Sequence, residues 1–507
     1  MTLEGQVGKC FAVGFEGTSA PPYLLEWLNE GRVGGVILFA RNVDHPAQLA
    51  ALTQTLHAAA REPILIGIDQ EGGTVARLRG AFTEAPSAMA LSNTDDPQTA
   101  EAAYHLLGQE MYELGINWDY APVLDLAYNR ENPSVGTRSF GRGAERVGRF
   151  ARAAVRGLQR AGVAACAKHF PGLGNTAVDS HLALPTLDTP LDHMLQHDLE
   201  PYRQVIAEGV ASVMTTHTRF TALDPQHPAT VSPVVVRRLL REELGYDGLV
   251  TTDCMEMRAI ADHYTPSESA VMALLADVDI VLFSHTRAVQ EAAMQAVIDA
   301  VKHGRLPLSR VESANARRAR LLERFPAAET DLSRIGSSER RQTMEAIAAR
   351  GLSLLKGSLP PIAFDERTAF VEFASALESA VMESGGHTTL RQQLDALGMR
   401  PRYVALRPTG DDPHTAQAVE QARQAQIAII ATRSAHLLPD QAACARQIAE
   451  QARVVVHLCL RTPYDAELID AQAVIATCGD SQPQIAAVLR ALRGEVNPAH
   501  GLRVDVA

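Results

Sequence analysis

The chain has 507 residues, enough for two or three domains, and its 46% hydrophobic and 21% charged residues are typical of a soluble globular protein. Its formal net charge is −12 and lysines and arginines do not cluster, which argues against a nucleic-acid partner. The six cysteines form no Cys-x-x-Cys pair, which favours buried free thiols over a disulfide framework or a zinc site.

The N-terminal residues lack the basic start and apolar stretch of a signal peptide. No apolar run approaches the roughly 20 residues of a membrane span, so we expect no membrane partner. Scattered thiols and a missing leader together predict a cytoplasmic protein, if this is the full chain. No oligomeric state is predicted.

The first two thirds of the chain alternate short apolar runs with segments of helical periodicity. Strands are predicted at residues 10–15, 33–39, 63–68, 117–124, 163–168, 212–216, 248–252 and 279–283. Helices are predicted between or after most of them, such as 46–60, 99–114, 144–161 and 289–302. This alternation predicts a (β/α)8 TIM barrel. The alternative is a doubly wound open sheet, which usually has fewer strands.

A second α/β pattern follows the first. Strands are predicted at residues 369–373, 402–406, 427–432, 454–460 and 473–476, with helices between them. We therefore expect a barrel over residues 1–330, a helical linker over 331–355, and a smaller three-layer α/β/α sandwich over 356–507. The sandwich sequence has no Gly-x-Gly-x-x-Gly, so a dinucleotide site is not supported. We expect no cofactor.

Polar side chains follow several predicted barrel strands directly. They include Asp69, Asp125, His169, His217 and Asp253. In a barrel these positions form the carboxyl-end rim, where active sites lie. The alternative is that polar residues simply end strands, but the repeated Asp and His residues favour a site.

The segment 168–181 is the most informative, because it places Lys168, His169, Asp179 and His181 around a turn rich in glycine and proline. Asp179 and His181 are two residues apart, so a bent loop can direct both side chains to one point. An aspartate beside a histidine holds the imidazole in one tautomer and raises its basicity, which predicts an acid/base pair. The alternative is a surface loop with incidental polar residues.

Three further positions are candidates for the same site. Asp253 ends a buried strand, where its carboxylate could attack a substrate carbon or bind a metal, or could cap the next helix. Asp69 precedes a Gly-Gly turn that lets Arg77 fold back to the rim, and Arg138 lies in the loop 132–141. The alternative for both arginines is a solvated turn.

In this order, the pieces resemble glycoside hydrolase family 3, and within it the β-N-acetylhexosaminidase branch. The matching segments are 33–39, 69–73, 121–125, 132–141, 168–174, 179–181 and the strand ending in Asp253, and 494–498 resembles the end of the family's second domain. The Asp-Ser-His element at 179–181 separates this branch from β-glucosidases of the family, whose acid/base is a carboxylate from a later domain.

The resemblance implies a retaining exo-β-N-acetylglucosaminidase that acts on peptidoglycan fragments (muropeptides) in cell-wall recycling, without a metal. It implies that Asp253 is the nucleophile, that His181 is the acid/base, and that Asp179 orients His181. It further implies sugar-binding roles for Asp69, Arg77, Arg138, Lys168 and His169. The chain departs from the family pattern at Leu173, where the family usually has His, and at Asn175, where it usually has Asp.

Four other functions remain as alternatives, and one of them is a broader β-glycosidase of the same family. A metal-dependent barrel hydrolase would use ligands among His169, Asp179, His181, His217 and Asp253, but Lys168 would compete with the cation. A sugar-binding protein that has lost catalysis would need neither Asp253 nor His181. A phosphorylase is a closer alternative, because a histidine acid/base would repel phosphate less than a carboxylate does.

Overall fold

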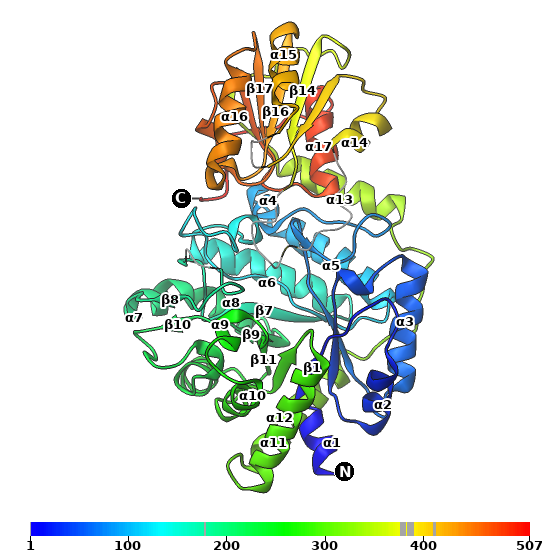
Figure 1. Cartoon of the computed structure of the whole chain (residues 1–507), viewed down its shortest axis with the longest axis vertical. Coiled ribbons are helices and arrows are strands. Elements are labelled where there is room, and N and C mark those ends of the chain that lie inside the picture. Colours follow the sequence, from blue (N-terminus) through cyan, green and yellow to red (C-terminus); the bar gives the residue numbers. More distant parts are fainter. Residues whose placement is uncertain (1, 177–178, 376–381, 383–389, 409–411, 507) are drawn as a thin grey trace.

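The computed structural model describes residues 2–176, 179–375, 382, 390–408 and 412–506. Figure 1 shows two bodies, a larger one that contains the N-terminus and a smaller one above it that contains the C-terminus. No described helix is long and apolar enough to cross a membrane.

The larger body is a closed barrel of parallel strands. In the described part of the chain the eight strands are β1 (Phe11–Val13), β2 (Gly35–Leu38), β3 (Leu65–Ile68), β6 (Trp118–Asp119), β7 (Ala164–Phe170), β9 (Ser212–Thr215), β11 (Leu249–Cys254) and β12 (Ile280–Phe283). Each pairs with its neighbours in chain order, and β12 closes the ring against β1. The predicted barrel is confirmed.

Apolar side chains fill the inside of the barrel, and a second set packs between the strands and the surrounding helices. The inner set includes Ile37, Trp118 and Met214, all buried. The fourth strand is shorter than the predicted 117–124, since β6 ends at Asp119 and a single bridge joins Val123 to Lys168. Pro122 interrupts the strand, because a proline has no N–H to donate to a ladder.

Helices cover the outside of the barrel close to the predicted positions. They include α3 (Pro46–Ala59), α5 (Pro97–Glu113), α6 (Ala144–Arg160) and α11 (Arg287–Lys302). On α6 the apolar residues recur every three or four positions and are buried, while arginines such as Arg149 and Arg152 face outward. Asp96 caps α5 by accepting a hydrogen bond from the backbone N–H of Gln98 at 3.0 Å.

The smaller body is a three-layer α/β/α domain around a mixed sheet. Its strand order is β15 (Arg402–Leu406), β14 (Thr368–Phe373), β16 (Ile427–Thr432), β17 (Val455–Cys459), β18 (Ala473–Ala476), β13 (Ser353–Gly357) and β19 (Ala499–His500). All neighbours are parallel except β13 and β18. Helices α15 (Thr415–Gln424) and α16 (Pro439–Ala449) cover one face, and α14 (Leu390–Ala396) and α17 (Gln482–Leu492) cover the other.

Helix α12 (Leu308–Arg324) packs on the barrel against α1 (Leu3–Gly8) and β11, and the chain then reaches the sandwich through α13 (Ser338–Arg350). Helix α13 contacts α5 of the barrel domain and α17 of the sandwich. We propose the division 1–330, 331–355 and 356–507, in which α13 is the helix of the linker and β13 spans the linker's end.

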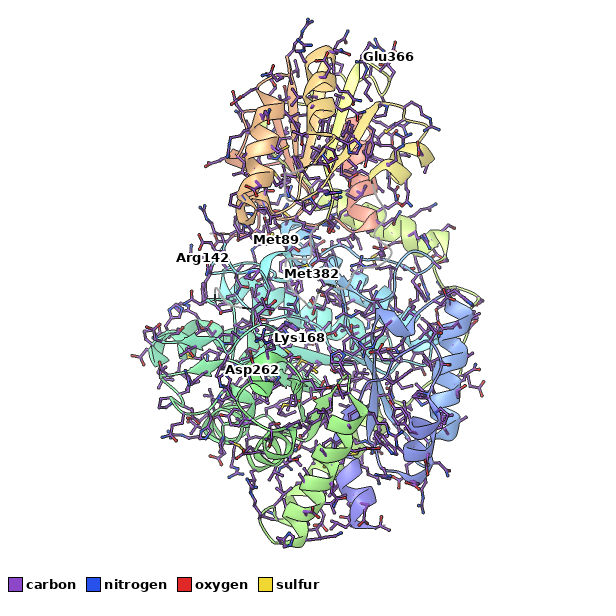
Figure 2. All side chains as sticks on the ribbon, in the orientation of Figure 1. Met89, Arg142, Lys168, Asp262, Glu366 and Met382 are labelled. Atoms are coloured by element: carbon purple, nitrogen blue, oxygen red, sulfur yellow. The ribbon has the colours of Figure 1, made fainter. Side chains whose placement is uncertain are left out.

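The two domains share an apolar and hydrogen-bonded boundary. Met89 of α4 (Ala88–Asn93), labelled in Figure 2, is fully buried and belongs to the apolar core of the sandwich. Asn93 Nδ2 donates to the carbonyl of Gly351 at 2.8 Å, and its Oδ1 accepts from the backbone N–H of Arg503 at 2.9 Å. Because these groups are buried and satisfied, the sandwich is anchored to the barrel domain.

Candidate active site

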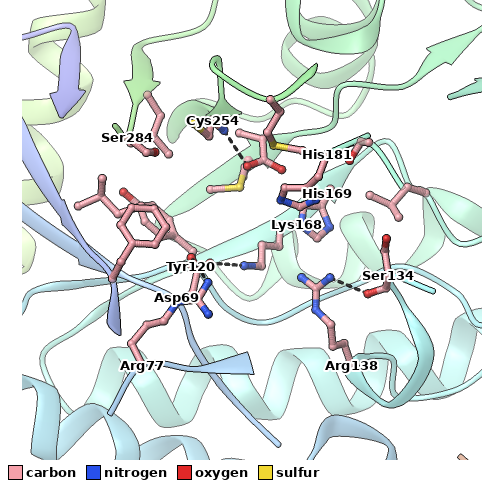
Figure 3. A pocket seen from close by; sticks show the side chains of 18 of the residues that line it. Asp69, Arg77, Tyr120, Ser134, Arg138, Lys168, His169, His181, Cys254 and Ser284 are labelled. Atoms are coloured by element: carbon pink, nitrogen blue, oxygen red, sulfur yellow. Dashed lines mark hydrogen bonds and ion pairs between the residues drawn. The ribbon is translucent and has the colours of Figure 1, made fainter. Parts of the chain in front are cut away.

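A cavity of about 290 Å³ opens at the carboxyl end of the barrel (Figure 3). Its lining contains seven of the eight residues proposed from the sequence: Asp69, Arg77, Arg138, Lys168, His169, His181 and Asp253. The eighth, Asp179, contacts His181 from outside the lining. The remaining lining includes apolar and aromatic side chains such as Phe39, Tyr120 and Met257.

Arg77 reaches the cavity because a short hairpin turns the chain back after β3. Strands β4 (Gln70–Gly72) and β5 (Val75–Ala76) form this hairpin, and Gln70 Oε1 accepts from the backbone N–H of Arg77 at 2.9 Å. At the turn, Gly73 has φ of 59°, and a Cβ there would lie 2.6 Å from the Cβ of Ser87. The position therefore requires glycine.

A buried network of charges forms one side of the cavity. Lys168 Nζ lies 2.7 Å from Asp69 Oδ1 and 2.6 Å from Glu71 Oε1. Arg138 binds Glu71 through two parallel hydrogen bonds of 2.8 Å each, and Arg77 Nη2 lies 3.2 Å from Asp69 Oδ2. Both arginines are buried, so neither is a solvated turn residue.

The network keeps its members ionised. Burial alone would raise the pKa of Glu71, but the nearby Arg138 and Lys168 outweigh it and lower that pKa to about 2. Burial would also raise the pKa of Asp69, but the nearby Lys168 and Arg77 outweigh it and lower that pKa. For Lys168, burial lowers the pKa and the two carboxylates raise it, with a net rise. The site thus holds fixed charges that can orient polar groups of a ligand.

Two histidine–aspartate pairs lie at the cavity. His181 Nδ1 lies 2.8 Å from Asp179 Oδ1, and His169 Nδ1 lies 2.7 Å from Asp125 Oδ2. Because an ionised carboxylate can only accept, each Nδ1 carries a hydrogen and each neutral ring has its lone pair on Nε2.

The two pairs differ in exposure and support. The His169 side chain is 7% exposed and lies within β7, and Asp125 Oδ1 also accepts from the backbone N–H of Leu173 at 2.9 Å. The His181 side chain is 27% exposed and lies in the loop after β7. Access to solvent makes His181 the better placed of the two to exchange protons with water.

Asp253 lies at the end of β11 and lines the cavity. Its Oδ1 accepts from the backbone N–H of Cys254 at 2.7 Å, which fixes the carboxylate. The next helix, α9 (Arg258–Ala261), has Met257 as its N-cap, so Asp253 is not a helix cap. Burial raises the pKa of the neighbouring Cys254 thiol to about 12, so this thiol is uncharged near neutral pH.

His217, which also follows a strand, has a different role. Its Nδ1 lies 2.8 Å from Thr230 Oγ1, and its Nε2 lies 2.9 Å from the carbonyl oxygen of Cys254. It is fully buried outside the cavity lining, and burial lowers its pKa. His217 therefore supports the backbone beside Asp253.

Two charged partners in the site were given no role from the sequence, although Asp125 was among the strand-end residues that indicated the rim. Glu71 joins Lys168 to Arg138, and Asp125 holds His169. Both are carboxylates that follow a strand, and both lie in the segments that resemble the family. Their position was a usable signal, but only the folded structure pairs them with their partners.

The two departures from the family pattern lie in different surroundings. Leu173 is buried and lines the cavity, while Asn175 is exposed. Asn132 Nδ2 donates to the carbonyl of Leu173 at 3.1 Å and to that of Gly174 at 3.4 Å. The backbone before the Asp179–His181 pair is therefore held without the two missing polar side chains.

A third carboxyl group, Asp119, lies behind the charge network and is fully buried. Its Oδ1 accepts from the backbone N–H of Gln70 at 2.9 Å. Burial raises its pKa far above the ordinary range, and the charges of Asp69 and Glu71 act in the same direction. Burial therefore disfavours the ionised form of Asp119. Among the described residues, no group of three or more His, Cys, Asp or Glu side chains is arranged to hold a metal ion.

Comparison with known proteins identifies the larger domain. The family model described as "Glycosyl hydrolase family 3 N terminal domain" matches residues 7–321. Beta-hexosaminidase A of Pseudoalteromonas piscicida is 35% identical over 376 residues, which cover 68% of this chain and 63% of that protein. Beta-hexosaminidase of Alkalilimnicola ehrlichii is 40% identical over 284 residues, which cover 55% of this chain and 81% of that protein.

A solved structure is similar over both domains. It is a glycoside hydrolase family 3 β-N-acetylglucosaminidase from Paenibacillus sp. str. FPU-7, with 34% sequence identity and a TM-score of 0.92. The similarity covers 100% of each chain. The sandwich is thus part of the shared architecture.

Proposed function

Because this chain belongs to glycosyl hydrolase family 3, we propose that it is a retaining exo-β-N-acetylglucosaminidase that removes terminal β-linked N-acetylglucosamine. The observation that carries the proposal is that Asp253 and His181 line one cavity, with His181 held by Asp179. The cavity thus offers a fixed carboxylate and an accessible imidazole.

In the proposed reaction Asp253 is the nucleophile. Its carboxylate attacks the anomeric carbon, the bond to the leaving oxygen breaks, and a covalent glycosyl-enzyme forms. The hydrogen bond from the Cys254 backbone at 2.7 Å leaves the second carboxylate oxygen, Oδ2, for the attack. Water then displaces Asp253 from the opposite face, so two inversions give net retention.

His181 transfers the protons of both steps. As an imidazolium it gives the Nε2 proton to the leaving oxygen, and as a neutral ring it then takes a proton from the attacking water. Asp179 keeps the ring oriented through Nδ1 and stabilises its positive charge. Catalysis of this kind typically accelerates a reaction about 10²–10⁴-fold.

The remaining charged residues bind the sugar in this proposal. The Asp69 and Arg138 side chains face the cavity with oxygens and N–H groups that suit sugar hydroxyls and the acetamido group. Arg77, Lys168 and His169 complete the set. Since the network is preorganised, binding requires little rearrangement of the protein.

We further propose that the substrates are peptidoglycan fragments and that the enzyme works in the cytoplasm during cell-wall recycling. The named relatives are bacterial β-hexosaminidases, which supports an amino-sugar substrate. All six cysteines are buried and free, which supports a reducing compartment.

The stereochemistry of the first product tests the mechanism. Proton NMR during hydrolysis of a β-N-acetylglucosaminide should show the β-anomer of N-acetylglucosamine first, followed by mutarotation. Initial appearance of the α-anomer would rule out the covalent route. The same reaction with added phosphate separates a hydrolase from a phosphorylase, because a phosphorylase would release N-acetylglucosamine 1-phosphate and slow greatly without phosphate.

A further inference from the structure

A histidine of the sandwich reaches across the domain boundary to the barrel. His436 lies in the short helix Ala435–Leu437, and its Nε2 is 3.0 Å from the backbone carbonyl oxygen of Arg130. Because a carbonyl oxygen can only accept, Nε2 is the donor in this bond, and since the Asp465 carboxylate beside Nδ1 also accepts, the two bonds together require a hydrogen on each ring nitrogen. The His436 side chain is 9% exposed, while Arg130 is exposed, so water can reach this bond from the barrel side.

A buried carboxylate fixes the His436 ring. Asp465 Oδ1 lies 3.0 Å from His436 Nδ1, and Asp465 Oδ2 accepts from Thr432 Oγ1 at 2.7 Å and from the Ala435 backbone at 2.9 Å. The Tyr464 ring packs edge-on against the imidazole at 5.1 Å between centroids. The ring is therefore held on two sides with its Nε2 directed at the barrel.

The acceptor belongs to the barrel loop 128–135, which holds the segment that leads to the acid/base pair. Asn132 Nδ2 donates to the carbonyls of Leu173 and Gly174, and Asn129 Nδ2 donates to that of Thr176 at 3.4 Å. Asn132 Oδ1 also accepts from the backbone of Ser134 at 2.9 Å. One loop thus contacts the sandwich on one side and residues 173–176 on the other.

We infer that His436 is a positioning residue through which the sandwich holds the loop 128–135, and with it the segment that carries Asp179 and His181. The inference rests on the proposed function of His181 as acid/base. It assigns the second domain a part in catalysis without contact with the substrate. Small displacements of a catalytic group have large effects on rate, so a remote hydrogen bond can matter.

The leaving group of the substrate separates positioning from general stability. A 2,4-dinitrophenyl aglycone leaves without a proton, whereas the sugar leaving group of N,N′-diacetylchitobiose needs one from His181. We expect His436→Ala to lower kcat/KM for chitobiose about tenfold, because one hydrogen bond that positions the catalytic segment is lost. We expect kcat/KM for the dinitrophenyl substrate to change less than about twofold. A variant that is only less stable would lose both activities equally.

Two further variants complete the test. His436→Gln keeps an N–H donor at the position of Nε2 and should restore most of the chitobiose activity. His414→Ala is the matched control, because His414 Nδ1 lies 2.9 Å from Asp412 in the same domain and its side chain is 60% exposed. It should behave as the wild type. Hydrogen exchange of the folded His436→Ala variant should rise in residues 128–135.

The outcomes distinguish the inference from the proposed function. If wild-type protein cleaves both substrates and His436→Ala equals it on both, the positioning role is wrong. Equal loss on both substrates without restoration by His436→Gln would equally overturn it. If wild-type protein cleaves neither substrate, the proposed function itself fails, and the exchange measurement alone then decides whether His436 holds the loop.

Discussion

The Oδ1 atom of Asp179 accepts two hydrogen bonds from His181, one from ring Nδ1 at 2.8 Å and one from the backbone N–H at 2.9 Å. The carboxylate therefore fixes both the ring and the chain that carries it. Because the two residues are only two positions apart, the pair keeps its geometry wherever the loop lies. The proposed acid/base unit is thus local to the loop, and its placement at the cavity depends on the contacts of that loop.

Removal of the proposed nucleophile should abolish turnover and leave the fold intact. We expect Asp253→Ala to lower kcat on the order of 10⁴-fold, because the variant lacks the carboxylate that attacks the anomeric carbon in the proposed reaction. Asp253→Asn is the matched variant, since its side-chain oxygen can still accept from Cys254. Both should unfold at the same urea concentration as wild type. Near-normal turnover by either variant would disprove the nucleophile assignment.

Loss of the acid/base should depend on the leaving group. His181→Gly should lower kcat/KM about 10²–10⁴-fold for a sugar aglycone and far less for 2,4-dinitrophenyl, because only the former needs a proton. Steady-state rates on both substrates measure this. His227→Ala is a control. His227 Nδ1 lies 3.2 Å from Asp224 Oδ2 in a similar pair, and neither residue lines the cavity. Equal losses on both substrates would contradict the acid role.

Removal of Lys168 should destabilise the protein as well as inactivate it. Lys168→Met removes a positive charge that balances the buried carboxylates of Asp69 and Glu71. This should lower the free energy of unfolding by about 3–5 kcal/mol near pH 7. Urea unfolding measures it. Lys356→Met is the control, because Lys356 and Asp470 form an exposed pair worth less than about 1 kcal/mol.

The difference in the free energy of unfolding between wild type and Lys168→Met should depend on pH, with a sign that follows from the pKa of Glu71. The pKa of Glu71 is lowered to about 2 in the folded protein from an ordinary value of 4.5. Its ionised form therefore stabilises the fold above the ordinary value, and this contribution disappears as the pH falls toward about 2. The difference between wild type and Lys168→Met should narrow over that range. If the stability difference between wild type and Lys168→Met stays constant as the pH falls, the charge network is not its cause.

The contribution of Asp119 to stability should depend on pH in the opposite direction to that of Glu71. Its pKa is raised by burial and by neighbouring carboxylates, so the folded protein holds this proton more tightly than the unfolded chain does. It weakens the fold progressively as the pH rises above the ordinary value of 3.8, by up to about 1.4 kcal/mol per pH unit. Asp119→Asn should match wild type near pH 4 and exceed its stability at pH 8. Lower stability of the variant at pH 8 would contradict a raised pKa of Asp119.

Much of the fold was predictable because local sequence patterns encode it. The barrel strands follow from apolar runs at regular spacing, and helices such as α6 follow from apolar residues at every third or fourth position. The short fourth strand was not predictable to the residue. An apolar run shows where a strand can form, but Pro122 and the pairing with β7 decide where the ladder stops.

The site was predictable in its residue types but not in its partners. Strand-end aspartates and histidines indicate the carboxyl rim because a barrel brings all strand ends to one place. Pairings such as Asp125 with His169, or His436 with Arg130, join residues that are 44 and 306 positions apart. No periodicity encodes such distant contacts, so only the folded chain shows which groups meet.

The most direct test of the proposed function is a pair of initial rates. Wild-type protein is assayed on 4-nitrophenyl β-N-acetylglucosaminide and, under the same conditions, on 4-nitrophenyl β-glucoside. We predict efficient cleavage of the acetamido sugar, little cleavage of the glucoside, and loss of both in Asp253→Ala. A preference for the glucoside, or no cleavage of the acetamido sugar, would contradict the assignment as a β-N-acetylglucosaminidase.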